Sequence, residues 1–289
     1  MQNKHLIRVC YYKLLFIGFL AFHLTVKSET MASKKLVLPS ILSSLKKLTM
    51  KNLFFLLFLL PVLGIGQTKT VLSSNRLFAK NDKVGEFENA LSSHAKKYHT
   101  ADVAWRVWSI QSGPDAGGYM VTEGPSTWAN LDSRGDISAE HTTDWEKNVL
   151  PLTTGLGQSD YYDFQVDLST VQLTDYADKI VINHMTAKPG KISNMRTLIQ
   201  KLKKVWTADS ESVAVYSSAF SGEPGYISVS RLKNGLKELA SDYRKPMADR
   251  FNAVNGTGSF DAWLKDYAEV VQSRWSELLI YKPLLSSNN

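Results

Sequence analysis

Five side chains of the sequence could line a pocket for a small molecule. They are polar or aromatic residues within apolar segments, and a few polar groups in an apolar lining are typical of such a pocket. An alternative is that Arg106 pairs with Asp163 or Asp167 and so links two strands, or that this surface is solvated. The candidate ligand-binding residues are Arg106, Trp108, Asp163, Gln165 and Tyr216.

The motifs of several common catalytic sites are missing from the sequence. No G-x-S-x-G turn is present to carry the nucleophile of a serine hydrolase. Neither a P-loop nor a G-x-G-x-x-G follows an expected strand, which argues against nucleotide binding. Cys10 is the only cysteine, and it precedes the expected mature chain. A thiolate nucleophile and a cysteine-based metal site are therefore not expected.

Four histidines follow residue 66. His94 and His99 flank the polar end of an expected helix, in SSHAKKYH, and we expect both to be solvated. His141, in AEHTTDWEK, is expected to be an exposed or capping residue at the start of a helix. His184 lies on an expected strand, where a core or a pocket role fits equally well. Because the four are scattered and form no H-x-x-x-H or H-E-x-x-H pattern, the sequence predicts no metal site.

Strand alternation assigns the candidates to a face, since successive side chains of a strand point to opposite sides. The residues expected to cover the helices are Val103, Trp105, Val107, Tyr162, Phe164, Val166 and Leu168. The residues expected on the other face, toward an interior, are Arg106, Trp108, Ile110, Tyr161, Asp163, Gln165, Asp167, Tyr216, Ser218 and Phe220. The candidate pocket therefore depends on how this second face is covered.

Two Gly-rich turns, SGPDAGGY at 112–119 and SGEPGY at 221–226, indicate an internal duplication. Thr-Ala-Asp at 100–102 matches Thr-Ala-Asp at 207–209, and Gly-Tyr at 118–119 matches Gly-Tyr at 225–226, both with an offset of 107 residues. Repetition at a fixed distance is the signature of a repeated structural unit.

Each copy predicts the order β-α-β-β-α-β, the ferredoxin-like unit. Apolar residues recur at helical spacing after KVG at 83–85 and after KPG at 188–190. Two alternating runs joined by a Gly-rich turn then predict a hairpin, and a second helix (139–150 and 259–275) and a closing strand (161–168 and 276–284) follow. The second copy also carries an inserted helix, interrupted near Pro246.

The segment INHMTAKPGKISNMRTLIQKLKK at 182–204 resembles the strand, Pro-Gly turn and helix that begin many dimeric α+β barrel proteins. Examples are the NIPSNAP-like and antibiotic-biosynthesis-monooxygenase-like families. The resemblance covers about 70–170 and 179–285. It implies an α+β fold of two tandem ferredoxin-like repeats that pack sheet to sheet as a pseudo-dimeric barrel, because an isolated sheet would leave one apolar face bare. The alternative is that each copy pairs with another chain as a homodimer.

Within this superfamily, haem-degrading monooxygenases use an Asn on the first strand, a Trp near the third strand and a haem-ligating His on the second helix. The resemblance therefore implies Asn75, Trp128 and His141 as candidates for a haem site in the first copy. The second copy has no Trp or His at the corresponding places. No cofactor is predicted, and haem stays an alternative.

The start of the sequence carries an export signal. Met50, Lys51 and Asn52 precede the apolar run LFFLLFLLPVLGI, with a cleavage site expected between Gly66 and Gln67. We therefore expect a signal peptide at 50–66, a spurious upstream extension at 1–49, a first repeat at 67–175 and a second repeat at 176–289. A membrane anchor around 11–26 is the other interpretation of the extension.

The positive charge of the chain belongs to this leader. Residues 1–66 hold 9 of the 34 basic and 1 of the 27 acidic residues, so 25 basic and 26 acidic residues remain, a net charge of −1. Nucleic-acid binding, which needs an excess of clustered Lys and Arg, is not predicted.

The sequence thus predicts a secreted or periplasmic bacterial protein that binds a small apolar or aromatic molecule. The alternative is a monooxygenase-like or haem-binding enzyme that uses a cavity in the first repeat.

Overall fold

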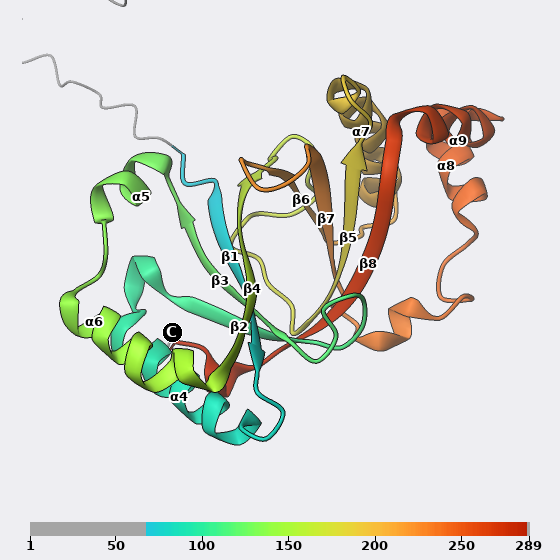
Figure 1. The fold of residues 1–289 in the computed structure, drawn as a ribbon. Coiled ribbons are helices and arrows are strands. Elements are labelled where there is room, and N and C mark those ends of the chain that lie inside the picture. The colour runs from blue at the N-terminus through green and yellow to red at the C-terminus, as the bar shows by residue number, and fades with distance from the viewer. Residues whose placement is uncertain (1–67, 288–289) are drawn as a thin grey trace, which may run out of the picture. The chain divides into compact units, whose positions relative to one another are not determined.

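Eight antiparallel strands close into a barrel, and helices pack on its outside (Figure 1). The structure is a computed structural model, and it describes residues 68–287. The expected signal peptide at 50–66 and the extension at 1–49 lie outside the described residues.

Each half of the barrel has the predicted β-α-β-β-α-β order. The first half consists of β1 (Val71–Ala79), α4 (Val84–Tyr98), β2 (Trp105–Ile110), β3 (Tyr119–Ser126), α5 (Trp128–Arg134), α6 (Ala139–Asp144) and β4 (Thr153–Phe164). The second half consists of β5 (Lys179–Ala187), α7 (Ile192–Ala208), β6 (Val213–Ser218), β7 (Gly225–Arg231), α8 (Met247–Asn255), α9 (Ser259–Val270) and β8 (Val271–Tyr281). The predicted α+β fold class is confirmed.

The two half-sheets pair with each other inside one chain. The strand order around the barrel is β1-β3-β2-β8-β5-β7-β6-β4. One seam joins β2 to β8, where Ser109 faces Ile280, and the other joins β4 to β6, where Asp163 faces Ser217. The two repeats of one chain therefore form the barrel together, and the predicted pseudo-dimeric barrel is confirmed.

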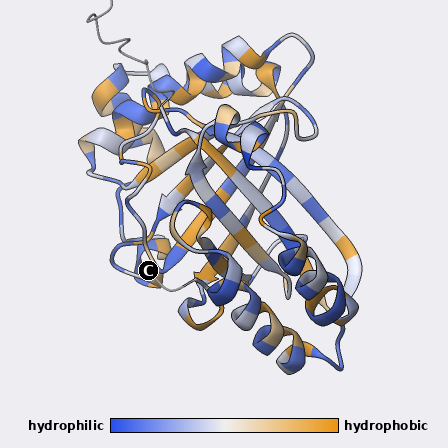
Figure 2. Ribbon diagram, turned by 90° about the vertical axis from the view of Figure 1, so that its left-hand side faces the viewer, coloured by the Kyte–Doolittle hydropathy of each residue, from blue (hydrophilic) through white to orange (hydrophobic). Residues whose placement is uncertain are grey.

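Helical spacing of apolar residues forms a core between the sheet and the helices of each half. On α4 the buried residues Phe87, Leu91 and Ala95 repeat every fourth position, so they share the face that meets β2 and β3. On α7 the corresponding face carries Met195 and Ile199. Figure 2 shows this division, with hydrophobic and hydrophilic residues alternating along the strands and around the helices.

The barrel interior is a third apolar core, and both halves contribute to it. Its buried residues from the first half are Trp108, Ile110, Met120, Tyr162, Phe164 and Leu173. Those from the second half are Ile180, Ile182, Ala214, Tyr216, Ile227, Val229 and Leu279. Neither half can cover this face alone, so the interior core holds the two repeats together.

The repeated turn has a steric reason. A Cβ at Gly225 would lie 2.2 Å from the carbonyl oxygen of Met185, and one at Gly118 would lie 2.7 Å from the ring of Phe78. Neighbouring chain segments pass so close at both places that only glycine fits without a shift. Each copy thus has a glycine at the start of its third strand where a side chain would be crowded, by the backbone of β5 at Gly225 and by the Phe78 ring of β1 at Gly118.

Two predicted boundaries were wrong. The segment 271–275 is the start of β8 and not the end of a helix, because Ala187 pairs with Val271 and His184 with Trp275. Likewise β4 begins at Thr153 and ends at Phe164, since the polar segment 153–160 pairs with β1 along its length. In both cases pairing with a neighbouring strand outweighs local propensity.

The second half carries additional helical structure between β7 and α9. A short 3-10 turn spans Leu236–Leu239, and α8 follows Pro246, which stands at its N-terminal cap position. In α8, Phe251 is fully buried against Trp263 of α9. Apolar contacts between α8 and α9 therefore complete the core on the helical side of the second half.

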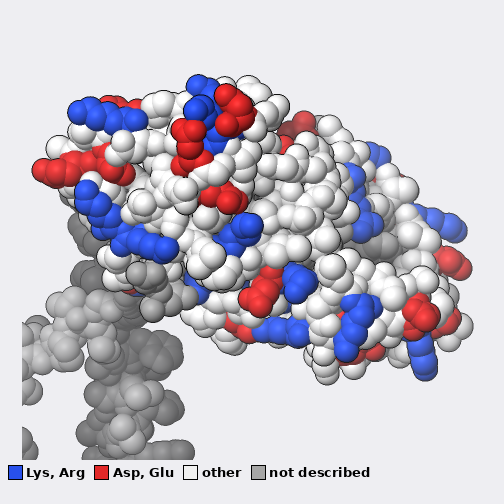
Figure 3. Space-filling view, turned by 90° about the horizontal axis from the view of Figure 1, so that it is seen from below, with Lys and Arg blue, Asp and Glu red and all other residues white. Residues whose placement is uncertain are grey.

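The described surface mixes both signs of charge. On the face shown in Figure 3, Lys and Arg side chains stand among Asp and Glu, and no broad area carries one sign. Within residues 68–287, no helix combines the length and the apolar character that crossing a membrane requires.

Candidate functional site

Two of the candidate residues lie where strand alternation predicts them, inside the barrel. Trp108 and Tyr216 line an interior cavity of about 60 Å³. Ser74 Oγ and Trp108 Nε1, which also border this cavity, have no hydrogen-bond partner among the described residues. A volume of this size holds about two water molecules, and a water needs such polar partners. The interior cavity is therefore suited to ordered water.

The interior assignment of Asp163 and Gln165 was wrong. Tyr162 and Phe164 point into the barrel instead, so Asp163 lies on the outer side of β4. The chain leaves the sheet after Phe164, and alternation no longer applies to Gln165, whose side chain bonds Ser217 Oγ at 3.1 Å and Arg196 Nη1 at 2.9 Å. Phe220 was also expected in the interior, but β6 ends at Ser218, and Phe220 beyond that end is 98% exposed.

Arg106 does not pair with either expected carboxylate. Its guanidinium stacks on the ring of Tyr176, 3.5 Å from the ring centre, which is a cation–π contact. Asp167 instead pairs with Arg196. The strand-linking pair that the sequence suggested is therefore not formed, and Arg106 contacts Tyr176 while Asp167 contacts Arg196.

A larger cavity, of about 430 Å³, lies in the first half beside β1 and β4. This volume is within the range of small-molecule sites. Asn75 and His141 border it, whereas Trp128, the third residue of the haem alternative, does not. Trp128 packs on the surface against Tyr161 and Phe220. The polar residues of the lining are Asn75, Arg76, His141, Thr153, Gln158 and Ser159, and its aromatic residues are Trp105 and Trp145.

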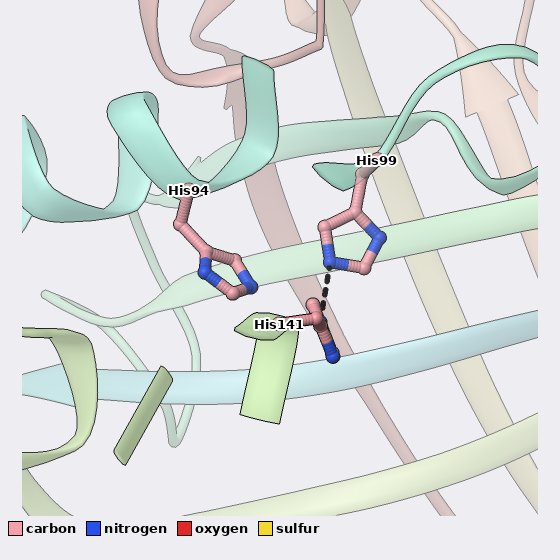
Figure 4. Close-up of side chains that lie close together, drawn as sticks. All are labelled: His94, His99 and His141. Carbon is pink, nitrogen blue, oxygen red and sulfur yellow. Dashed lines mark hydrogen bonds between the residues drawn. The ribbon is translucent and has the colours of Figure 1, made fainter. Parts of the chain in front are cut away.

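His141 joins His94 and His99 in one cluster at the wall of this cavity (Figure 4). One ring nitrogen of each lies within 4.8 Å of the others. The expectation that His94 and His99 are solvated was wrong, because their exposed fractions are only 1% and 3%. His94 turns inward from α4 and His99 from the segment that follows, and both rings pack on Trp105.

Each of the three histidines bonds an acceptor through Nδ1. His94 Nδ1 lies 2.7 Å from a carboxylate oxygen of Asp144, and His141 Nδ1 lies 2.9 Å from one of Asp136. His99 Nδ1 lies 3.2 Å from the carbonyl oxygen of Val103 and 3.3 Å from Glu123 Oε2. Carboxylate and carbonyl oxygens only accept hydrogen bonds, so each Nδ1 carries a proton.

Burial keeps the two inner rings neutral. It lowers the pKa of His94 more than the bond to Asp144 raises it, and it likewise lowers the pKa of His99. Burial would raise the pKa of Glu123, but the bond from His99 and the charge of Arg134 outweigh it, so this pKa is lowered. The cluster therefore combines neutral imidazoles with ionised carboxylates behind them.

The haem alternative does not fit these residues. A haem ligand must turn a free ring nitrogen toward the iron. His141 Nδ1 is held by Asp136, and its Nε2 faces His99 Nε2 at 3.2 Å. No ring nitrogen of His141 is thus free to face the cavity, and we derive no step through haem.

His184 takes a core role inside the barrel. Its ring stacks on Trp275 at 3.7 Å, and its Nε2 donates to Glu277 Oε1 at 2.8 Å. Arg76 donates to both oxygens of Glu277, at 2.6 and 2.7 Å. Since Arg76 belongs to β1 and Glu277 to β8, this buried network ties the first half to the second.

The cluster was missed because its members are not close in sequence. His94 and His99 are five positions apart, and His141 is brought in by α6. One signal was present: His141 has an Asp five positions before it and another three positions after it, and these two carboxylates hold His141 and His94.

The fold defines this protein as a single-chain form of the dimeric α+β barrel. No protein-family model matches the sequence. No curated protein matches it either.

Solved structures resemble the chain in fold. A candidate monooxygenase from Lactobacillus acidophilus NCFM is 10% identical, with 76% of this chain and 96% of that chain covered and a TM-score of 0.44. An anthrone oxidase-like protein is 14% identical, with 75% and 92% covered and a TM-score of 0.49. A chlorite dismutase mutant from Candidatus Nitrospira defluvii is 7% identical, with 75% and 94% covered and a TM-score of 0.44. Identities this low leave the function to be argued from the chain's own residues.

Proposed function

We propose that this protein is exported from a bacterial cell and binds a small, mainly apolar molecule in the cavity of its first half. The observation that carries the proposal is the lining of that cavity, in which Trp105, Trp145 and four aliphatic side chains surround amide and hydroxyl groups, one guanidinium and one imidazole. Such a mixture buries an apolar ligand and fixes its orientation through the polar groups. Export rests on the signal peptide that the sequence predicts at 50–66.

The rim of the cavity supports an apolar ligand. Leu150 and Leu156 border the cavity and are 46% and 72% exposed. Exposed leucines beside a cavity gain by being covered, since burial of apolar surface is favourable. Asn75 and Ser159 bond each other at 2.6 Å across β1 and β4 and supply polar groups at the same wall.

An enzyme is the second candidate, and the histidine cluster favours it. His141 borders both the cavity and the pair His94 and His99, whose pKa values burial lowers. Titratable groups with shifted pKa values at the wall of a cavity mark candidate catalytic sites. The protein would then act on the molecule that the cavity binds.

Replacing Leu150 and Leu156 together by Gln is expected to weaken the binding of the dye 1-anilinonaphthalene-8-sulfonate at least about tenfold. Each leucine that the dye covers contributes on the order of 1 kcal/mol. Fluorescence titration of the purified protein measures the change. Leu236 and Leu239 are similarly exposed, at 45% and 52%, in the second half. Their double replacement by Gln is the matched control and should leave binding unchanged.

Equal losses in both double variants would mean that the dye covers exposed leucines in either half, and the proposed site would be wrong. Native mass spectrometry of protein from an exporting host provides an independent check. A bound mass that disappears on denaturation, and that is lost in the Leu150 and Leu156 variant, is the expected result.

A further inference from the structure

The Nε2 atoms of His94, His99 and His141 are the ring nitrogens left to bind a ligand, because each Nδ1 donates to an oxygen acceptor. In the neutral form of each ring, Nε2 then presents a lone pair. His99 Nε2 and His141 Nε2 face each other at 3.2 Å. His94 Nε2 is buried and has no hydrogen-bond partner among the described residues. Two lone pairs at this distance repel unless a positive charge lies between them.

We propose that the three Nε2 atoms bind a divalent transition-metal ion, with zinc as the ion that the ligand set fits best. A tetrahedral zinc ion with Zn–N distances of about 2.0–2.1 Å holds its ligand nitrogens roughly 3.3 Å apart. The pair His99 and His141 already has this spacing, and a ring nitrogen of His94 lies within 4.8 Å of theirs, so the His94 ring would move toward the ion. A shared proton would satisfy that pair but would leave His94 Nε2 unpartnered, whereas a metal ion satisfies all three.

The groups behind the histidines are those of a metal site. Ligating imidazoles usually donate their other N–H to a carboxylate or a carbonyl, which fixes the tautomer and raises the basicity of the ligand. Asp144, Asp136 and Glu123 occupy these places here. Glu123 is itself held by Trp105 Nε1 at 3.0 Å and by Arg134. These carboxylates also compensate the charge of the ion.

The second half provides a comparison, because its helix α7 has no histidine at the position that corresponds to His94 of α4. Counted from the first residue of α4 and of α7, Leu202 stands where His94 does. Leu202 packs on the apolar core that α8 and α9 complete. The same fold can therefore fill this position with leucine, so the buried His94 is not a requirement of the fold.

Three protein ligands leave one position of a tetrahedral ion for water or substrate, as in catalytic zinc sites. His141 connects the cluster to the 430 Å³ cavity, because it borders both. An ion here would supply a Lewis acid to a molecule in that cavity. This last step rests on the proposed function, whereas metal binding itself does not.

The test uses purified protein, expressed from the full chain, stripped with EDTA and titrated with Zn²⁺ alone and Co²⁺ alone. We expect one Zn²⁺ per chain and a Co²⁺ absorption spectrum of a four- or five-coordinate ion. Loss of an outer-shell partner reduces metal affinity about 10–100-fold, so Asp144→Asn should fall in that range. His94→Leu removes a proposed ligand, so its Zn²⁺ affinity should be reduced by more than about 100-fold relative to the wild type.

His94→Leu also separates a ligand from a structural residue. We expect the variant to fold as well as the EDTA-treated wild type, because leucine fits the corresponding place in the second half. Zn²⁺ should raise the unfolding midpoint of the wild type but not that of the variant. His184→Gln, which changes a histidine outside the cluster, is the control and should keep full Zn²⁺ affinity.

Wild-type protein that binds no Zn²⁺, or His94→Leu that binds it as tightly, would overturn the metal site. The outcomes for the two proposals stay distinguishable. Dye binding that depends on Leu150 and Leu156 would persist if only the metal site were wrong, and Zn²⁺ binding would persist if only the ligand cavity were wrong.

Discussion

Replacing Glu277 by Gln is expected to lower the free energy of unfolding by about 3–5 kcal/mol at neutral pH. Glu277 is fully buried and accepts from both terminal nitrogens of Arg76 and from His184 Nε2. Its neutralisation leaves the Arg76 guanidinium buried beside an amide, with Asp115, at 3.5 Å, as its one remaining ion-pair partner among the described residues. Urea denaturation of both proteins measures the difference.

The effect depends on pH in a defined direction. Burial would raise the pKa of Glu277, but the hydrogen bonds from Arg76 and His184 outweigh it, and the pKa in the folded protein is below the ordinary value of 4.5. A lowered pKa stabilises the fold above the unfolded value and loses this contribution as the pH falls through the folded value. The difference in the free energy of unfolding between Glu277→Gln and the wild type should therefore become smaller below about pH 4.5.

Two further variants define the cause. Glu269→Gln changes an exposed carboxyl of α9 and should alter stability by less than about 0.5 kcal/mol. Arg76→Met combined with Glu277→Leu removes both charges and should be far less destabilised than Glu277→Gln. A double variant as unstable as the single one would show that packing, and not the buried charge, sets the loss.

Separating the halves is expected to abolish folding of both as monomers. Fragments 67–175 and 176–289 would each expose one face of the interior core, to which both halves contribute about equally. An exposed apolar face of that extent drives association or aggregation. Sedimentation and circular dichroism of each fragment measure this, and we expect aggregates or self-associated species.

Co-expression is the control for this experiment. The two fragments together should restore a one-to-one complex, because β2 with β8 and β4 with β6 supply the seams. The intact chain should unfold in a single cooperative transition. A fragment that is a folded, dispersed monomer would contradict the prediction and would mean that each sheet is stable without its partner.

The fold was accessible from the sequence because local patterns agree with the tertiary structure. Helical spacing in α4 and α7, the repeated Gly-Tyr turns and the order of elements are all local signals. The face of β4 was not, because strand alternation fixes two sets of residues but not which set points inward. The pairing of β4 with β1 and β6 decides this, and that pairing is non-local.

The histidine cluster could not be predicted from the sequence either, because it also depends on contacts between residues distant in sequence. Spacing rules detect ligands on one helix or in one loop, whereas His94, His99 and His141 come from α4, from the segment after it and from α6. The cavity next to them is likewise formed by strands and helices distant in sequence. Asn75 and His141 reached that cavity as the resemblance suggested, but Trp128 did not.

The fusion of two repeats into one barrel also changes what single mutations can do. In a barrel made of two identical chains, every substitution appears twice, and a change that destabilises one subunit destabilises both. Here His94 stands in the first repeat at the position where the second has Leu202 packed on an apolar core. A substitution in one repeat leaves the other repeat unchanged, so the two halves can differ in their side chains while both keep the same fold.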